Sequence, residues 1–146
     1  MEVNGYKIEP NAELPNAELT GTYLSLVNLT KANLTGANLT GADLTAANLY
    51  GATMQEAQSS GANLTGSRLS NANLTNANLM KATFYSADLT GADLTGANLA
   101  GANLFYANLT NANLTNANLT GADLRSVNLT NTNLTGATMP DGTIHD

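Results

Sequence analysis

Few side chains of this 146-residue chain could take part in catalysis. His145 is the only histidine and cysteine is absent, so neither a thiolate nucleophile nor a cysteine-based metal site can form. Asp141, His145 and Asp146 lie at the end of the chain, where we expect nothing to hold a general base or a metal ligand in place. The sequence contains no phosphate-binding loop, dinucleotide fingerprint, nucleophile elbow or HExxH motif. We therefore predict no catalytic residue, no cofactor, no metal site and no enzymatic activity.

Two groups of residues remain as candidates for binding a partner. The first combines aromatic rings with a guanidinium and consists of Tyr85, Phe105, Tyr106 and Arg125. The second belongs to the least regular stretch of the chain, residues 53–60, and consists of Gln58, Ser59 and Ser60. Which of these side chains meet depends on the elements that position them.

A five-residue repeat positions almost every residue of the chain. The unit reads Ala-Asn/Asp-Leu-Thr/Ser-Gly/Asn, as in residues 37–41. Counting its central residue as position i, the centres run from Leu14 to Ile144 in steps of five, which makes 27 units, 22 of them centred on leucine. The other centres are Met54, Ser59, Phe84, Met139 and Ile144.

A period of five fits neither a straight helix nor a straight strand. On a helix, leucines five apart would spread around the axis, and on a strand they would alternate between opposite faces. All of them point inward only if the chain turns a corner once in every unit. Residues i−2 and i then face the core, i−1 faces outward, and i+1 with i+2 form the corner, where Gly and Asn tolerate unusual backbone angles. Such a chain winds into a solenoid whose coils hydrogen-bond to one another.

This pattern resembles the pentapeptide-repeat family, whose consensus is A(D/N)LXX, over residues 11–144. The resemblance implies an all-β fold, a right-handed quadrilateral parallel β-helix with four pentapeptides per coil and nearly seven coils. Residues 20 apart would then stack on one another. Met54 and Phe84 would fill the core.

Stacking at 20-residue intervals predicts the neighbours of the outward side chains. Tyr85, Phe105 and Arg125 would lie in one column, with Tyr106 beside Phe105, which makes either a stiffening stack or a surface for a protein partner. Arg68 and Asp88 would form a surface ion pair. Outward amides such as Asn98 and Asn118 would hydrogen-bond along the stack.

Ser59 occupies a leucine position between Leu39 and Leu79. A buried hydroxyl without a partner costs about 1–3 kcal/mol, so we expect Ser59 to find a partner or the wall to bulge at residues 53–60. The bulge would be a tolerated defect or a recognition loop.

We expect one domain, residues 1–146, with an N-terminal lid (1–10), the repeats (11–144) and a tail (145–146). Ile144 is in phase and would close the last coil. Open solenoid ends expose unpaired strand edges, which suggests an end-to-end homodimer.

The net charge of −6 is concentrated at the ends: residues 1–20 carry −3, residues 141–146 carry −2, and residues 21–140 carry −1. No basic patch favours nucleic acid, and no apolar run could span a membrane. No signal peptide is visible, so the default localisation is cytoplasmic, with a trimmed periplasmic or thylakoid-lumen form as the alternative. Repeated Asn-Leu-Thr triplets would crowd glycans on stacked coils, which favours a bacterial source.

These features favour a non-catalytic scaffold that binds an unknown protein partner. One alternative, drawn from the resemblance, is a DNA-mimicking inhibitor of DNA gyrase or topoisomerase, which the nearly neutral wall disfavours. The second alternative is a surface that orders ice or water, suggested by the column Thr75, Thr95, Thr115 and Thr135.

Overall fold

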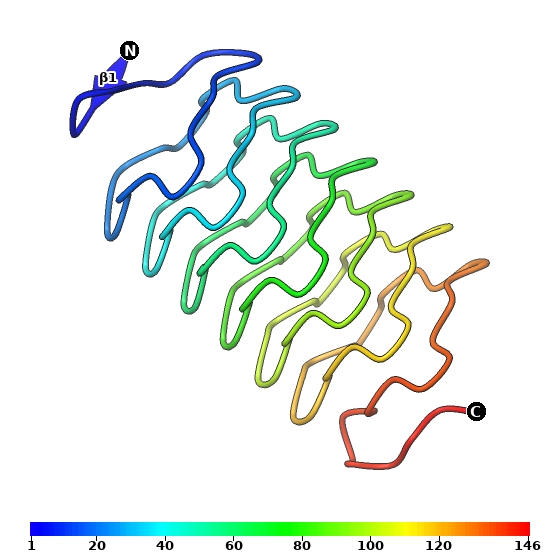
Figure 1. The fold of residues 1–146 in the computed structure, drawn as a ribbon. Coiled ribbons are helices and arrows are strands. Elements are labelled where there is room, and N and C mark those ends of the chain that lie inside the picture. The colour runs from blue at the N-terminus through cyan, green and yellow to red at the C-terminus, as the bar shows by residue number, and fades with distance from the viewer.

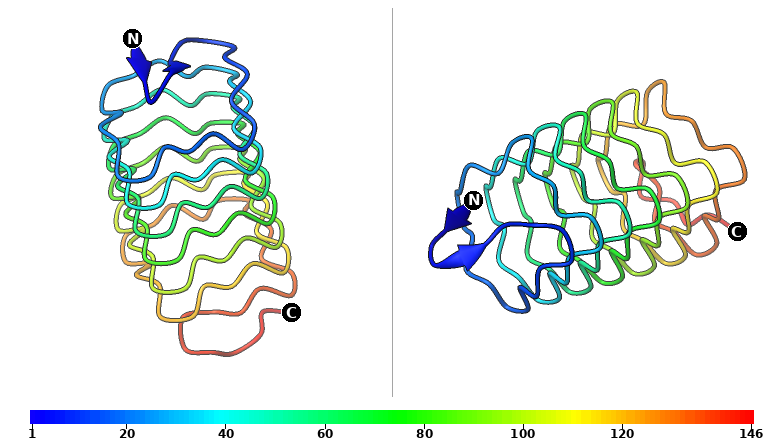
Figure 2. Two further views of the ribbon diagram at one scale, coloured as in Figure 1. Left: turned by 60° about the vertical axis from the view of Figure 1, so that its left-hand side comes forward. Right: turned by 90° about the horizontal axis from the view of Figure 1, so that it is seen from above.

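The computed structural model describes residues 1–146 as a row of stacked four-sided coils, with the two termini at opposite ends (Figures 1 and 2). Its only regular strands are β1 (Glu2–Val3) and β2 (Tyr6–Lys7), which pair antiparallel before the first coil. No helix is present, and thus none that could cross a membrane. The rest of the chain forms the coils, in which each side contributes one bridging residue.

The bridges show how many pentapeptides make a coil. Each outward residue i−1 pairs in parallel with the residue 20 further on, from Glu13↔Asn33 to Asn118↔Thr138. Three backbone hydrogen bonds accompany each pairing; for one of them, the N–H of Leu34 donates to the carbonyl of Thr53, at 2.7 Å. The predicted four pentapeptides per coil are therefore confirmed.

The corners are built from left-handed residues. Every residue at position i+2 from Asn11 to Gly136 has a positive φ, between 54° and 72°. The N–H of the next residue closes the turn on the carbonyl of residue i, as Ala37 does on Leu34 at 3.0 Å. Gly and Asn dominate this position because they adopt such angles at the lowest cost.

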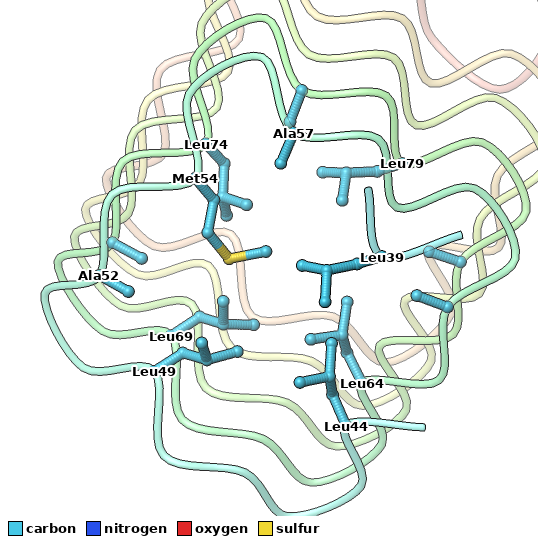
Figure 3. Close-up of a cluster of buried hydrophobic side chains, with 14 of the residues drawn as sticks. Leu39, Leu44, Leu49, Ala52, Met54, Ala57, Leu64, Leu69, Leu74 and Leu79 are labelled. Atoms are coloured by element: carbon cyan, nitrogen blue, oxygen red, sulfur yellow. The ribbon is translucent and has the colours of Figure 1, made fainter. Parts of the chain in front are cut away.

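The core consists of leucine and alanine columns that point toward the axis of the coils (Figure 3). Met54 and Phe84 are fully buried in leucine positions, as the sequence predicted. Each coil therefore depends on its neighbours to bury its apolar side chains, and the buried residues form one continuous cluster.

The N-terminal hairpin lies over the first coil. The side-chain amide of Asn4 donates to the carbonyl of Glu18 at 3.1 Å, and the hydroxyl of Tyr6 accepts from the N–H of Glu18 at 3.3 Å. Ile8 is buried against the core. These contacts fix residues 1–10 on one end of the solenoid.

The C-terminal end differs from the expectation. Ile144 does not close the last coil: the chain reverses at Gly142, where φ is 86°, and Ile144 pairs antiparallel with Thr138. Its side chain is 61% exposed. The reversal occurs because the last left-handed corner is Gly136, and residue 141, which would form the next one, does not adopt that conformation.

Candidate interaction surface

The aromatic patch, defined as Tyr85, Phe105 and Tyr106 with Arg125, holds all the contacts between aromatic rings in the structure. The ring centroids of Tyr85 and Phe105 lie 5.9 Å apart, and those of Phe105 and Tyr106 lie 4.3 Å apart. Tyr85 and Tyr106 meet edge to face at 6.1 Å. The 20-residue period places Tyr85 and Phe105 in one column, and the adjoining corner places Tyr106 beside both rings.

Arg125 completes the patch. Its guanidinium carbon lies 5.1 Å from the centroid of the Phe105 ring. The guanidinium is held by Asp123, with Nε donating to Oδ1 at 2.9 Å and Nη2 to Oδ2 at 2.7 Å. These hydrogen bonds from Arg125 lower the pKa of Asp123 to about 2. The structure thus brings together the four residues that the spacing predicted, and it fixes the cation over the ring.

The patch is open to solvent. Tyr106 is 55% exposed and Tyr85 is 40% exposed, while Phe105 is half-buried. Tyr106 also adopts a left-handed φ of 61°, which a bulky residue reaches only at a cost of about 1–2 kcal/mol. Contacts with the other two rings offset part of that cost.

The predicted ion pair between Arg68 and Asp88 is wrong. The guanidinium of Arg68 lies over the ring of Tyr50 instead, 5.8 Å from its centroid. Asp88 accepts hydrogen bonds from Ser70 and Thr90. Burial alone would raise the pKa of Asp88, but these hydrogen bonds and the charge of Arg68 outweigh it and lower the pKa.

The stretch around Ser59 is regular, contrary to both expectations. Gln58 bridges to Asn38 and Asn78 like any outward residue, so the wall does not bulge. Ser59 is fully buried, and its hydroxyl has no hydrogen-bond partner. The coil keeps its place because the backbone hydrogen bonds of this unit do not depend on which side chain stands at position 59. The hydroxyl of Ser60 donates to the carbonyl of Met80, at 3.1 Å.

The main role of the outward Asn and Asp residues was not predicted from the sequence. The Oδ1 atom accepts from both the N–H and the hydroxyl of the threonine two residues on; for Asn118 and Thr120 the distances are 3.0 and 2.6 Å. The same bonds from Thr45 lower the pKa of Asp43. The signal was present, since Asn or Asp precedes Thr by two residues in 13 of the 27 units. The amide ladder from Asn118 to Asn98 exists but is long, at 3.4 Å.

The structure contains no pocket and no group of three or more His, Cys, Asp or Glu side chains that could hold a metal ion. His145, at the C-terminal end, contacts the carbonyl of Asp146. The aromatic patch is therefore the feature of the wall with the most distinctive chemistry.

Comparison with known proteins agrees with the repeat. The family model described as Pentapeptide repeats (8 copies) matches residues 11–41, 22–58, 60–96 and 97–136. None of the curated proteins matches the chain.

Several solved structures are similar to the chain. HetL from the cyanobacterium Nostoc sp. strain PCC 7120, a pentapeptide repeat protein involved in heterocyst differentiation regulation, is 32% identical, with 93% of this chain and 86% of HetL covered and a TM-score of 0.47. Rfr23 from the cyanobacterium Cyanothece 51142 is 29% identical over 88% of this chain and 91% of Rfr23, with a TM-score of 0.58.

QnrB1, a plasmid-mediated fluoroquinolone resistance protein, shares only the fold: it is 18% identical over 90% of this chain and 71% of QnrB1, with a TM-score of 0.59. The likenesses to Rfr23 and QnrB1 confirm the predicted fold, a right-handed quadrilateral β-helix.

Proposed function

Because the chain belongs to the pentapeptide-repeat family, we propose that it is a non-catalytic scaffold that binds another protein through the aromatic patch. The main support is the patch itself, in which three rings and a guanidinium lie together on an outer wall otherwise made largely of Asn, Thr and Gly. Tyr, Phe and Arg are the residue types enriched at protein interfaces.

The patch is ready to bind without rearrangement. Stacking fixes the rings, and Asp123 fixes the guanidinium, so a partner would immobilise few free rotamers. The backbone that carries the rings is bonded to both neighbouring coils: the carbonyl of Phe105 accepts from the N–H of Ser86, and the N–H of Tyr106 donates to the carbonyl of Arg125. A rigid surface of this kind loses little conformational entropy when a partner binds.

The charge distribution favours a protein scaffold over a DNA mimic. Duplex DNA carries about one negative charge per 1.7 Å of its axis. Residues 21–140 of this chain, which form most of the wall, carry a net charge of only −1. QnrB1 supports the fold but no activity for this chain, because the two are 18% identical.

Three of the four hydroxyls in the column Thr75, Thr95, Thr115 and Thr135 favour a scaffold over an ice-binding surface. The hydroxyls of Thr75, Thr95 and Thr115 each donate to an Asn or Asp oxygen two residues earlier, at 2.6 Å. Their hydrogens are therefore directed at the protein and are not free for an ordered water layer.

The test compares partner capture by three proteins: the wild type, the double variant Phe105→Ser/Tyr106→Gly, and the control Tyr23→Ser. The control removes an 81% exposed tyrosine outside the patch. Glycine at position 106 suits the left-handed corner, so loss of binding in the double variant is not explained by a strained backbone. We expect a polypeptide from the source cells to bind the wild type and the control but not the double variant.

The purified polypeptide must then bind the purified wild type with the same dependence on Phe105 and Tyr106. Equal binding by the double variant would show that the patch is only a stiffening stack. Inhibition of DNA supercoiling by gyrase, or measurable thermal hysteresis, would instead support one of the two alternatives.

A further inference from the structure

The last coil ends in an unsatisfied strand edge. The backbone N–H groups on this edge that make no backbone hydrogen bond are those of Leu124, Ser126, Leu129, Asn131 and Leu134. The carbonyls of Ala122, Val127 and Thr132 accept no backbone bond either. The leucines of this coil are half-buried, whereas those of the internal coils are fully buried.

The first coil presents the opposite edge. The carbonyls of Glu13, Pro15, Tyr23, Ser25 and Asn28 accept no backbone hydrogen bond, and the N–H groups of Glu13, Tyr23 and Asn28 donate none. At Glu18, the hairpin supplies both partners through Asn4 and Tyr6.

These two edges are the two halves of one internal junction. Between coils, the N–H of residue i bonds the carbonyl 19 residues on, as Leu34 does with Thr53. A second copy that follows the last coil with the same spacing would offer the carbonyl of its Glu13 to Leu124 and that of its Tyr23 to Leu134. The other two sides would pair Leu129 with Glu18 and Met139 with Asn28.

The caps block those other two sides and part of a third. On the side that pairs Met139 with Asn28, the N–H of Asn11 also takes the carbonyl of Thr30, at 2.9 Å, and on the side of Leu134 the N–H of Gly136 donates to the carbonyl of His145, at 2.9 Å. The carbonyl of Glu18 is taken by Asn4 of the hairpin. The N–H of Met139 is taken by Thr143 of the C-terminal segment, at 2.7 Å. Figure 1 shows the hairpin and the C-terminal segment at the two ends of the stack.

We propose that the C-terminal coil is a docking surface for the N-terminal coil of a second copy of this chain, and that residues 1–10 and 140–146 prevent this association when both are folded in place. The association continues the ladder that already joins the coils, so it would repeat from copy to copy and form open chains. The two caps thus keep the stack finite. The end-to-end association suggested by the sequence becomes head-to-tail.

The test opens the caps in the 146-residue chain. Ile8→Asp places a charge at a buried site under the hairpin, and Gly142→Val removes the residue that allows the reversal at φ 86°. In the double variant, sedimentation velocity should show an apparent mass that rises with concentration beyond that of a dimer of the 15.0 kDa chain. Each single variant should keep one finite size, as the wild type does, because the remaining cap still blocks one side.

A folded double variant of one finite size at every concentration would overturn the proposal. A wild type or a single variant that grows open chains would overturn it as well, because the caps would then not prevent association.

Cysteine crosslinking tests the arrangement, since the chain has no cysteine of its own. Head-to-tail docking stacks Ser126 on Asn16 of the next copy, about 4.8 Å away, which a disulfide spans. Asn16→Cys with Ser126→Cys, added to the double variant, should give a ladder of covalent oligomers under oxidation. Ser126→Cys without Asn16→Cys should give none, and crosslinked dimers of it would show that tails meet tails, contrary to the proposal.

If the cap variants do not fold, the proposal can be tested with Asn16→Cys and Ser126→Cys in a chain whose caps are unchanged. Transient opening of the caps should then let covalent oligomers accumulate slowly under oxidant. Their absence after prolonged oxidation would also overturn the proposal.

Discussion

The hydroxyl of Ser67 donates to the carbonyl oxygen of Leu64, at 2.7 Å, inside the core. Ser59, eight residues earlier, is equally buried, but its hydroxyl has no partner. The two hydroxyls therefore contribute to the free energy of unfolding with opposite signs. One hydroxyl regains a hydrogen bond on folding, and the other only loses its hydration.

Ser59→Ala should stabilise the protein, by about 1–3 kcal/mol, because it removes an unpaired buried hydroxyl. Ser67→Ala is the matched control and should destabilise it by about 1 kcal/mol, because it removes a satisfied one. Urea denaturation of the two variants measures both changes. A loss of stability in Ser59→Ala as large as that in Ser67→Ala would mean that the Ser59 hydroxyl has a partner.

Leu26→Gly should raise the free energy of unfolding by about 1 kcal/mol. Leu26 adopts φ 62° at a corner, and its side chain is 80% exposed. The backbone strain is therefore not offset by packing of the side chain. Gly41→Ala is the reverse control: φ is +65°, and an added Cβ would meet nothing within 4 Å, so it should lose about as much. A destabilised Leu26→Gly would reveal a packing role for the leucine.

The fold follows from the sequence to an unusual extent, because one period sets it. The five-residue phase predicted which residues face the core, and the 20-residue period predicted that Tyr85 stacks on Phe105 with Arg125 next. Both depend on backbone geometry that repeats without change along the coils.

The predictions that were wrong concern side chains that can reach two alternative hydrogen-bond or charge partners. Arg68 could reach Asp88 or the Tyr50 ring, and the period does not decide between them. The outward Asn residues could bond along the stack or to the corner of their own unit, and the shorter local bond dominates. Ile144 keeps the phase of the repeat, and that phase wrongly predicted that it closes the last coil; instead the chain reverses at Gly142 and Ile144 pairs antiparallel with Thr138.

Stability should fall in acid through the outward aspartates. Hydrogen bonds from Thr45 lower the pKa of Asp43, and those from Arg125 lower that of Asp123. Below its ordinary pKa, each carboxyl binds a proton in the unfolded chain before it does in the folded one. Their contribution is therefore complete above that pKa and is lost as pH falls through the lowered values.

The measurement compares wild type with Asp43→Asn/Asp123→Asn, because Asn fills the same position in other units. Between about pH 5 and pH 2, the midpoint of urea denaturation should fall more steeply for the wild type than for the variant. Parallel curves would indicate that these two carboxylates are no better stabilised in the folded chain than in the unfolded one.

Two substitutions at Asn118 separate its two hydrogen-bonding roles. Asn118→Ala removes the acceptor for the N–H and the hydroxyl of Thr120 and should cost about 1–2 kcal/mol. Asn118→Asp keeps that acceptor but removes the amide that donates to Asn98 at 3.4 Å. If the bonds to the corner stabilise the coil, the Asp variant stays close to wild type in thermal denaturation while the Ala variant does not. If the hydrogen bond from Asn118 to Asn98 stabilises the coil instead, the two variants lose stability alike. That result would mean that side-chain bonds between coils stabilise the stack even at a distance of 3.4 Å.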